Sequence, residues 1–277
     1  MSLTESAKAF LNQLNVSARK KLGQNFMVSE NELSFIADAV DLGPGETVLE
    51  IGPGLGFLTR YLLEKKAHVL AVECDKIYTR FLNAHFNGSS FRLIEKDILM
   101  TDLKKDFQIT QAIKVAGNIP YNITSPILEW LIRNRGLVES AVLTTQLELA
   151  ERLAAKPGSK AWGSLSVFLQ LYSDIFFLKK IGRASFYPSP KVDSAVIRIE
   201  FLRKPRFQIP DENALFQLVR RAFQKRRKTI LNCLADESSK TFSKSPLLTT
   251  LHQTGIDPVR RPETLTIEEW AILCNCL

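Results

Sequence analysis

The feature that most constrains the fold is a regular alternation of short apolar segments and helical segments between residues 47 and 145. Strands that alternate with helices in this way form βαβ units, which assemble into a parallel sheet. The middle of the chain is therefore predicted to be α/β. The predicted strands are Thr47–Ile51, His68–Glu73, Phe91–Glu95, Ile113–Ala116 and Ser140–Thr145, and the predicted helices between them are Phe57–Lys65, Lys76–Phe86 and Ser125–Arg133.

The segments on either side of this region extend the prediction. Ser29 and Glu32 form a capping-box pattern ahead of a helix. Phe176–Lys180 and Ala195–Phe201 are predicted strands joined through a proline-rich turn. Because they are close in sequence, we expect antiparallel strands at the end of the parallel sheet. After Asp211 the periodicity is helical to the end of the chain.

These patterns predict two domains. Residues 1–205 are predicted to form a Rossmann-like sheet with antiparallel terminal strands and an N-terminal basic extension. Residues 206–277 are predicted to form a small all-helical domain. At about 70 residues this domain is near the lower size limit for folding alone.

The charge of the chain favours a polyanionic partner. It has 37 Lys and Arg against 29 Asp and Glu, so the net charge is +8 and the pI is about 9.3. A surplus of this size favours nucleic acid first.

Composition also argues against several classes of protein. Charge interrupts the apolar stretches before about 18 residues, which argues against a membrane helix. The N-terminus has no basic region followed by an apolar run, which argues against a secretory signal. The four cysteines form no CxxC pair and only three His are present, so we expect no metal site and no disulfide framework. This cysteine usage fits a reducing cytoplasm, where we expect the protein to act.

A glycine turn with Gly52, Gly54 and Gly56 connects the first predicted strand to a helix. Glycines allow a backbone to approach a ligand closely, and a helix N-terminus presents free N–H groups. The turn reads G-P-G-L-G-F, whereas a dinucleotide turn reads GxGxxG. Glu50 lies directly before it, where a carboxylate suits a cationic ligand better than a pyrophosphate. S-adenosylmethionine, with a sulfonium, an ammonium and no phosphate, is therefore favoured over a dinucleotide.

Two acidic residues at the ends of the next strands support the same cofactor. Glu73 lies 21 residues after Gly52, where a carboxylate binds both hydroxyls of a ribose. Asp97 follows the third predicted strand, and its carboxylate is placed to accept a hydrogen bond from an adenine amine.

The fourth predicted strand runs into Asn118, Ile119, Pro120 and Tyr121, at the edge where a parallel sheet binds its ligands. This order of residue types suits the binding of an exocyclic amine on a planar base. The Asn118 side-chain oxygen accepts one amine hydrogen, a carbonyl near Ile119 or Pro120 accepts the other, and Tyr121 stacks on the base. We therefore predict a catalytic role for Asn118, Pro120 and Tyr121.

Several segments of the chain resemble the signature motifs of known enzymes. Asn118–Tyr121 resembles the (N/D)-x-P-(Y/F) motif of amino-methylating enzymes. Other segments resemble signatures of KsgA-type (RsmA) small-subunit rRNA adenine dimethyltransferases, in the family's order. These are Arg19–Met27 (RKxLGQNFL), Glu50–Thr59 (EIGPGxGxLT), Phe186–Ser194 (FxPxPKVDS), Phe223–Thr229 (FxxRRKT) and Arg261–Leu265 (RPExL). Met27 and Ile119 stand where leucine is usual, and both keep its size and apolarity.

The resemblance implies a class I methyltransferase. Its expected reaction transfers methyl groups from S-adenosylmethionine to the amines of two adjacent adenosines in the 3′-terminal hairpin loop of 16S rRNA. It implies 30S particles as partners, a further role in small-subunit biogenesis, and stacking of Phe186 on the target base opposite Tyr121. We expect a monomer and no membrane partner. The resemblance and the glycine turn together give the expected cofactor-binding residues Asn25, Met27, Glu50, Gly52, Gly54, Gly56, Glu73, Asp97 and Asn118.

Basic clusters supply the expected RNA surface. Residues 220–228 hold six basic residues and no acid, and on a helix most of these would share one face. Phosphate contact is the expected role of such a stripe. Lys179 and Lys180 form a further small cluster. The predicted RNA-binding residues are Arg19, Lys20, Lys21, Arg220, Arg221, Lys225, Arg226, Arg227 and Lys228.

Two alternatives remain open at this point. A macrolide-resistance type methyltransferase, which acts on 23S rRNA, shares the cofactor turn and the Asn-x-Pro-Tyr motif. A non-catalytic rRNA-binding assembly factor could keep the same fold. The FxxRRKT and PKVDS segments favour the small-subunit enzyme over the first, and intact Glu73, Asp97, Asn118 and Tyr121 argue against the second.

Overall fold

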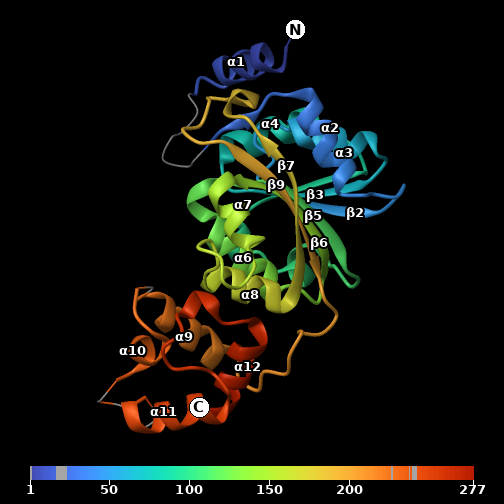
Figure 1. The fold of residues 1–277 in the computed structure, drawn as a ribbon. Coiled ribbons are helices and arrows are strands. Elements are labelled where there is room, and N and C mark those ends of the chain that lie inside the picture. Colours follow the sequence, from blue (N-terminus) through green and yellow to red (C-terminus); the bar gives the residue numbers. More distant parts are fainter. Residues whose placement is uncertain (1, 17–23, 226, 237, 239–241) are drawn as a thin grey trace. The chain divides into compact units, whose positions relative to one another are not determined.

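The chain divides into two compact units (Figure 1). A computed structural model describes residues 2–16, 24–225, 227–236, 238 and 242–277. The first unit comprises Met1–Ala150 and Asp174–Phe201, and the second comprises Glu151–Ser173 and Leu202–Leu277.

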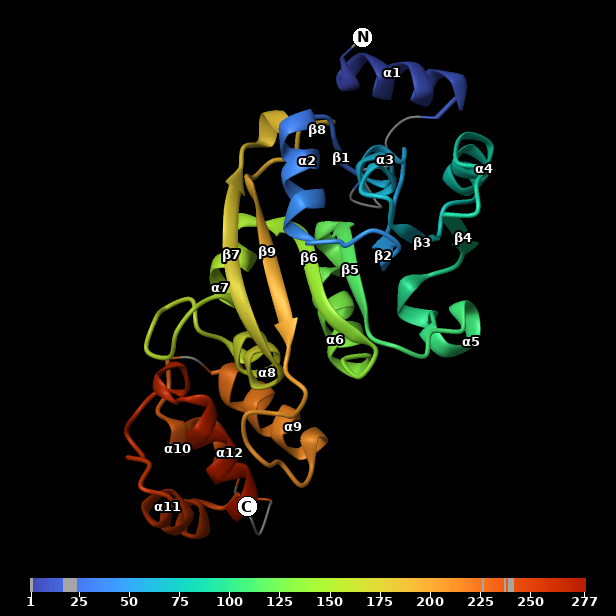
Figure 2. The ribbon, with the colours of Figure 1, turned by 90° about the vertical axis from the view of Figure 1, so that its right-hand side faces the viewer.

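A seven-stranded sheet with the order β4-β3-β2-β5-β6-β9-β7 forms the centre of the first unit. Its first five strands pair in parallel, and β9 pairs antiparallel with β6. In Figure 2 the arrows of β7 and β9 point in opposite directions. The predicted Rossmann-like sheet with antiparallel terminal strands is therefore confirmed. The bounds are β2 (Thr47–Ile51), β3 (His68–Glu73), β4 (Phe91–Glu95), β5 (Ile113–Asn118), β6 (Val138–Gln146), β7 (Ser173–Ile181) and β9 (Ser194–Phe201).

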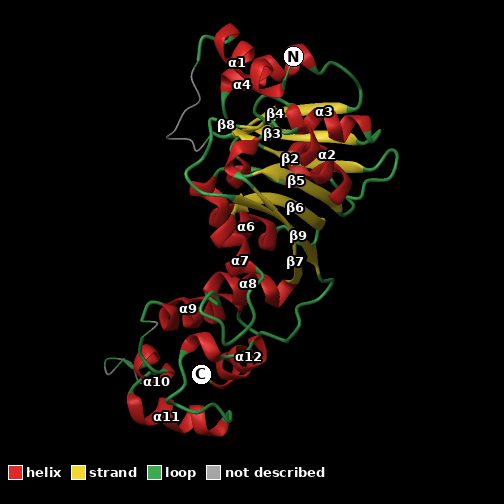
Figure 3. Cartoon of the chain, turned by 45° about the horizontal axis from the view of Figure 1, so that its top comes forward, coloured by secondary structure: helices red, strands yellow, loops and turns green. Residues whose placement is uncertain are grey.

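Helices lie on both sides of this sheet (Figure 3). They are amphipathic, as α3 illustrates: it buries Leu58, Thr59 and Leu62 and leaves Arg60 and Glu64 exposed. Burial of such an apolar stripe is what fixes a helix on a sheet. The helices are α1 (Leu3–Gln13), α2 (Glu30–Ala39), α3 (Phe57–Glu64), α4 (Lys76–His85), α5 (Leu103–Phe107), α6 (Thr124–Arg133) and α7 (Leu147–Leu153).

The predicted capping box at the start of α2 is wrong. Ser29 is the N-cap residue, but its side chain makes no capping hydrogen bond. The Glu32 carboxylate instead pairs with Lys179 of β7, with 2.8 Å between Nζ and Oε2. The Glu32 carboxylate, which the local pattern assigns to the helix cap, is therefore used in an ion pair with a lysine from a strand.

A second, two-stranded sheet joins segments that are far apart in the sequence. β1 (Phe26–Met27) pairs antiparallel with β8 (Phe186–Tyr187), so Met27 lies opposite Phe186. The Val28 N–H extends the contact by donating to the Ser185 carbonyl at 2.8 Å. Two of the recognised signature segments are thereby held side by side.

The second unit is helical. Sequence prediction assigns residues 151–173 to the sheet domain, but they group with the C-terminal helices. The reason is that α8 buries six of its nine residues, and its Phe168 ring lies 4.4 Å from that of Phe216 in α9. That residues 206–277 act as an RNA-binding domain stays a prediction. The helices are α8 (Ser164–Tyr172), α9 (Glu212–Phe223), α10 (Ile230–Leu234), α11 (Lys244–Gln253) and α12 (Ile267–Cys276).

We expect Gly117→Ala to lower the free energy of unfolding of the first unit by about 1–3 kcal/mol, as is usual for overpacking. A Cβ at Gly117 would lie 2.9 Å from the Ile51 carbonyl oxygen and 2.9 Å from the Ile119 Cδ1 atom. Urea unfolding followed by circular dichroism measures the effect. Gly88→Ala is the control, because a Cβ there meets nothing within 4 Å. Equal effects of the two substitutions would contradict this packing.

Candidate functional site

The C-terminal ends of β2, β3, β4 and β5 surround a cavity of about 270 Å³. This is the edge at which parallel α/β sheets bind their ligands. Most of the predicted site residues line it, which brings together segments from four strands and the N-terminal region. The predicted residues that line the cavity are Asn25, Met27, Glu50, Gly52, Gly54, Glu73, Asp97, Asn118, Pro120 and Tyr121.

The glycine turn has a left-handed backbone at Gly52, Gly54 and Gly56, with φ of +65°, +56° and +75°. Side chains are strained in this conformation, which explains three glycines in five residues. A Cβ at Gly52 would meet nothing within 4 Å, so the backbone there borders open space in the cavity. A Cβ at Gly56 would overlap the Phe86 ring. Gly56 does not line the cavity; it shapes the turn and begins α3.

Glu50 brings a buried carboxyl group to the cavity wall. Its side chain is 1% exposed and accepts a hydrogen bond from the Thr59 hydroxyl at 2.6 Å. Burial raises the pKa of Glu50 to about 8. Near neutral pH the group is therefore largely uncharged, and a cationic ligand beside it would favour its ionised form.

Glu73 links the glycine turn to the end of β3. Its carboxylate accepts from the N–H groups of Gly54 at 3.1 Å and Asp75 at 2.9 Å. Burial raises the pKa of Glu73, while these two donors oppose the rise. The side chain thus fixes the shape of the turn as well as facing the cavity.

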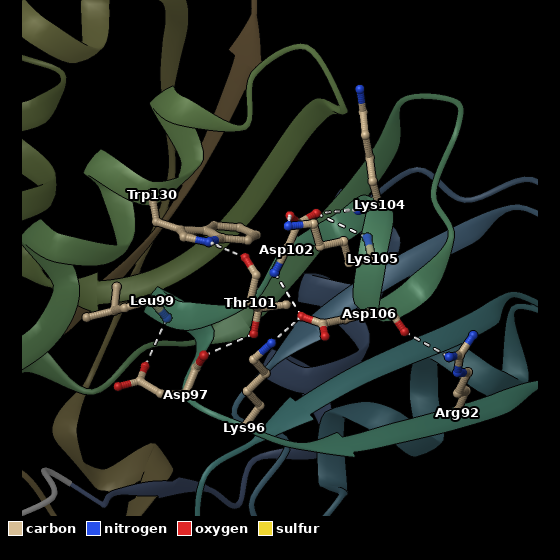
Figure 4. Close-up of polar contacts among 10 residues, drawn as sticks. All are labelled: Arg92, Lys96, Asp97, Leu99, Thr101, Asp102, Lys104, Lys105, Asp106 and Trp130. Carbon is tan, nitrogen blue, oxygen red and sulfur yellow. Dashed lines mark hydrogen bonds and ion pairs between the residues drawn. The ribbon is translucent and has the colours of Figure 1, made fainter.

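The loop that carries Asp97 is closed by its own hydrogen bonds (Figure 4). The Asp97 carboxylate accepts from the Leu99 N–H at 2.9 Å, and the Asp97 carbonyl accepts from the Thr101 hydroxyl at 3.0 Å. The Thr101 carbonyl in turn accepts from the Trp130 indole N–H at 3.1 Å. One Asp97 oxygen is thereby turned toward the turn Ile98–Met100, at the wall of the cavity.

Asp106 ties the two ends of this loop together. One carboxylate oxygen accepts from Lys96 Nζ at 2.6 Å and from the Asp102 N–H at 2.9 Å (Figure 4). The hydrogen bond from Lys96 holds the pKa of Asp106 below its ordinary value. Asp106 thus supports the cavity wall from behind.

The Asn118 amide is oriented by the N-terminal segment. Its Nδ2 donates to the Asn25 carbonyl at 2.8 Å. Its Oδ1 makes no hydrogen bond with the part of the chain that the structure describes. The acceptor end of the amide is therefore available to a ligand.

The turn after Asn118 is pinned by hydroxyl groups. The Pro120 carbonyl accepts from the Ile123 N–H at 3.1 Å and from the Thr124 hydroxyl at 3.2 Å, so both its lone pairs are used. The Ile119 carbonyl accepts no hydrogen bond from any described residue. Of the two carbonyls that the sequence leaves open, Ile119 is therefore the available acceptor.

The two predicted stacking rings lie in different environments. Tyr121 lines the cavity, and its hydroxyl lies 2.7 Å from Ser194 Oγ. Phe186 does not line the cavity: its side chain is 4% exposed and packs in the core beside Met27. The structure therefore places Tyr121, but not Phe186, at the candidate site.

The predicted helical basic stripe over residues 220–228 is wrong beyond Phe223, where α9 ends. Thr229 caps the next helix, so Lys225, Arg227 and Lys228 belong to the connection between α9 and α10. Arg221 pairs with Asp236 at 3.0 Å, while Arg220, Lys225, Arg227 and Lys228 are exposed. The remaining predicted RNA-binding residues, Arg19, Lys20, Lys21 and Arg226, lie outside the described residues.

Lys179 and Lys180 do not strengthen the case for a basic surface. Lys179 pairs with Glu32, and Lys180 pairs with Asp193 at 2.9 Å. Both are ion-paired within the first unit.

Sequence reasoning missed several residues of the site. The cavity is also lined by Lys96 and Tyr78. Thr59 donates a hydrogen bond to Glu50 and lies in the signature segment Glu50–Thr59. Its place in that segment is the sequence signal that indicates a role at the site. The sequence leaves the second acceptor open between the carbonyls of Ile119 and Pro120, and the choice between them depends on tertiary structure. The contact of Ser194 with Tyr121 also depends on tertiary structure, so no sequence pattern indicates it.

Metal and membrane features are absent from the described residues. No group of three or more His, Cys, Asp or Glu is arranged to hold a metal ion among them. None of the helices in the described parts of the chain is long and apolar enough to span a membrane.

Comparison with known proteins gives a consistent result. The family model of ribosomal RNA adenine dimethylase matches residues 15–277. Ribosomal RNA small subunit methyltransferase A of Geobacter metallireducens is 42% identical, over 95% of this chain and 96% of that protein. The same enzyme of Moorella thermoacetica is 40% identical, over 97% and 96%.

Two crystal structures share the fold. A dimethyladenosine transferase from Plasmodium falciparum has a TM-score of 0.73 and 25% identity, and covers 88% of this chain and 94% of that one. The 23S rRNA methyltransferase ErmE has a TM-score of 0.69 and 27% identity, with 91% and 99% covered. The length and identity of the sequence matches decide the assignment: this chain belongs to the ribosomal RNA adenine dimethylase family.

Proposed function

We propose that this methyltransferase dimethylates the exocyclic amines of two adjacent adenosines in the 3′-terminal hairpin loop of 16S rRNA, with S-adenosylmethionine as donor. The observation that carries the proposal is the pair of acceptors at the cavity. Asn118 presents Oδ1 because its Nδ2 is held by Asn25, and the Ile119 carbonyl lies one residue further. The family and the names of the sequence relatives supply the substrate class.

The cavity fits the cofactor. The backbone at Gly52 borders open space, which leaves room for a ligand against the turn. The buried carboxyl of Glu50 suits a cationic group, and Glu73 and Asp97 offer carboxylate oxygens for ribose and adenine. Asn25 and Met27 complete the wall from the N-terminal side. When bound, the cofactor supplies an electrophilic methyl group.

The two acceptors activate the target amine. Its lone pair is delocalised into the adenine ring, so the free amine is a poor nucleophile. Hydrogen bonds from its two N–H groups to Asn118 Oδ1 and the Ile119 carbonyl favour a pyramidal nitrogen and stabilise the positive charge that develops on it. Positioning adds to this, since effective molarity contributes roughly 7–11 kcal/mol in well-oriented reactions.

An aromatic ring and a basic surface hold the RNA. Tyr121 stacks on the adenine that has left the loop, and extrusion is easier from a loop than from a duplex. Phe186 as a second stacking ring rests on the family resemblance, since its ring is buried here. Arg220, Lys225, Arg227 and Lys228 contact phosphates in this proposal. We further propose a monomer that acts on 30S particles in the cytoplasm and contributes to their biogenesis.

The alternative of 23S rRNA methylation is less well supported. The similarity to ErmE concerns a fold that the two enzyme classes share. The sequence relatives that match nearly the whole chain are named for the small subunit. A purely structural assembly factor would not require the oriented Asn118 amide.

Methyl transfer tests the proposal directly. With tritiated S-adenosylmethionine, we expect label in dimethyladenosine near the 3′ end of 16S rRNA in unmethylated 30S particles. Asn118→Ala removes one of two acceptors and is expected to slow transfer about 100-fold or more. Digestion and mapping of the labelled RNA locate the product. Label confined to 50S particles in a parallel reaction would move the assignment to 23S rRNA.

Binding of the cofactor is expected to depend on pH through Glu50. A cation binds the ionised form, which becomes populated as pH rises through about 8. Affinity should therefore be about 25-fold higher at pH 8.5 than at pH 6.5, which is the ratio of the ionised fractions of Glu50. Calorimetric titration measures it, and Glu50→Gln, which cannot ionise, should show a flatter profile. Identical pH profiles of the two proteins would show that Glu50 does not contact the cation.

The RNA surface is tested through salt dependence. We expect Lys225→Gln combined with Lys228→Gln to weaken binding to 30S particles and to make the slope of log K against log salt shallower by roughly 1.5. Filter binding at several KCl concentrations measures this. Lys244→Gln, at another exposed lysine of the second unit, is the control. An unchanged slope in the double variant would show that Lys225 and Lys228 do not contact the phosphates of the RNA.

A further inference from the structure

The hydroxyl of Tyr121 is held by a residue with no assigned role. Tyr121 OH lies 2.7 Å from Ser194 Oγ, which is a hydrogen-bond distance for two hydroxyls. Tyr121 follows the end of β5, whereas Ser194 begins β9, and β6 lies between these two strands in the sheet. The contact therefore joins the Asn-x-Pro-Tyr turn to the end of the FxPxPKVDS segment.

The Ser194 hydroxyl lies inside the core and reaches the site through its hydrogen bond. Its side chain is 0% exposed, and a buried polar group requires a hydrogen-bond partner. Its partner is Tyr121, whose own side chain is only half-buried and lines the cavity. Ser194 thus makes its contact from within the core toward a ring at the site.

The backbone around Ser194 is rigidly placed. Ser194 pairs with Gln146 across the β6–β9 ladder. The neighbouring Asp193 accepts from the Leu147 N–H through its carbonyl at 3.0 Å, and its carboxylate binds Lys180 Nζ at 2.9 Å and the Arg183 N–H at 3.2 Å. The Ser194 hydroxyl is therefore held in a fixed position, from which it can orient the Tyr121 hydroxyl.

The other end of Tyr121 is fixed as well. The Thr124 hydroxyl lies 3.4 Å from the Tyr121 carbonyl and 3.2 Å from the Pro120 carbonyl. With the backbone held at one end and the hydroxyl at the other, the torsions of the side chain have little freedom. A ring that stacks on a substrate base is most effective when its orientation is fixed before the base binds.

We propose that Ser194 is a positioning residue for methyl transfer, which sets the plane of the Tyr121 ring against the target adenine. This rests on the proposed function, in which Tyr121 stacks on that base. Ser194 does not line the cavity and acts only through Tyr121. Its loss should lower the rate of the chemical step and leave binding of the cofactor unchanged.

A double-mutant cycle tests the proposal. Ser194→Ala, Tyr121→Phe and the double variant are compared with the unmodified protein in methyl transfer to unmethylated 30S particles at saturating S-adenosylmethionine. We expect each single variant to lower kcat about fivefold, and the double variant to lose no more than either single one. The KM for S-adenosylmethionine and the thermal unfolding midpoint are measured on the same proteins and should stay within twofold and within 3 °C.

A matched serine controls for the loss of a buried hydroxyl. Ser140 lies in β6, opposite Glu200, at the other end of the same ladder, and is 9% exposed. Ser140→Ala should leave kcat unchanged. If Ser194→Ala lowers kcat by the same factor in the Tyr121→Phe protein as in the unmodified protein, Ser194 does not act through the tyrosine. The same conclusion follows if Ser194→Ala alone leaves kcat unchanged. If the unmodified protein transfers no methyl group to 30S particles, the proposed function fails, and the inference fails with it.

Discussion

The constraint on which the site depends is the parallel alignment of β2, β3, β4 and β5. Because these strands point the same way, each of them ends at the same edge of the sheet. The residues at these strand ends, from the glycine turn to Asn118, therefore meet around one cavity although they are spread along the chain. No single segment could form the cavity alone, since each supplies only one of its walls.

Much of this arrangement could be predicted from the sequence, and the reason is periodicity. The first three predicted strands have the bounds that the structure shows, because short apolar segments bordered by turn residues are strong signals. Predictions failed where a distant group competes with a local pattern. Glu32 bonds Lys179 instead of capping its helix, and α8 packs on α9 instead of joining the sheet domain.

The candidate site was predictable in its composition and not in its orientation. Spacing after strands identifies Glu73, Asp97 and Asn118, since strand ends are visible in the sequence. The direction of the Asn118 amide depends on the Asn25 carbonyl, and the burial of Phe186 depends on its pairing with Met27. Both follow from the two-stranded sheet, whose strands are too short to give a periodic signal.

The pairing of β1 with β8 also has a consequence for synthesis of the protein. Phe26 and Met27 emerge from the ribosome early, but their partners, Phe186 and Tyr187, emerge only after all the strands that surround the cavity. A nascent chain can form those strands first, because domains fold as their segments become available. The wall that Asn25 and Met27 contribute is completed last, so the candidate cavity is complete only near the end of translation of the sheet domain.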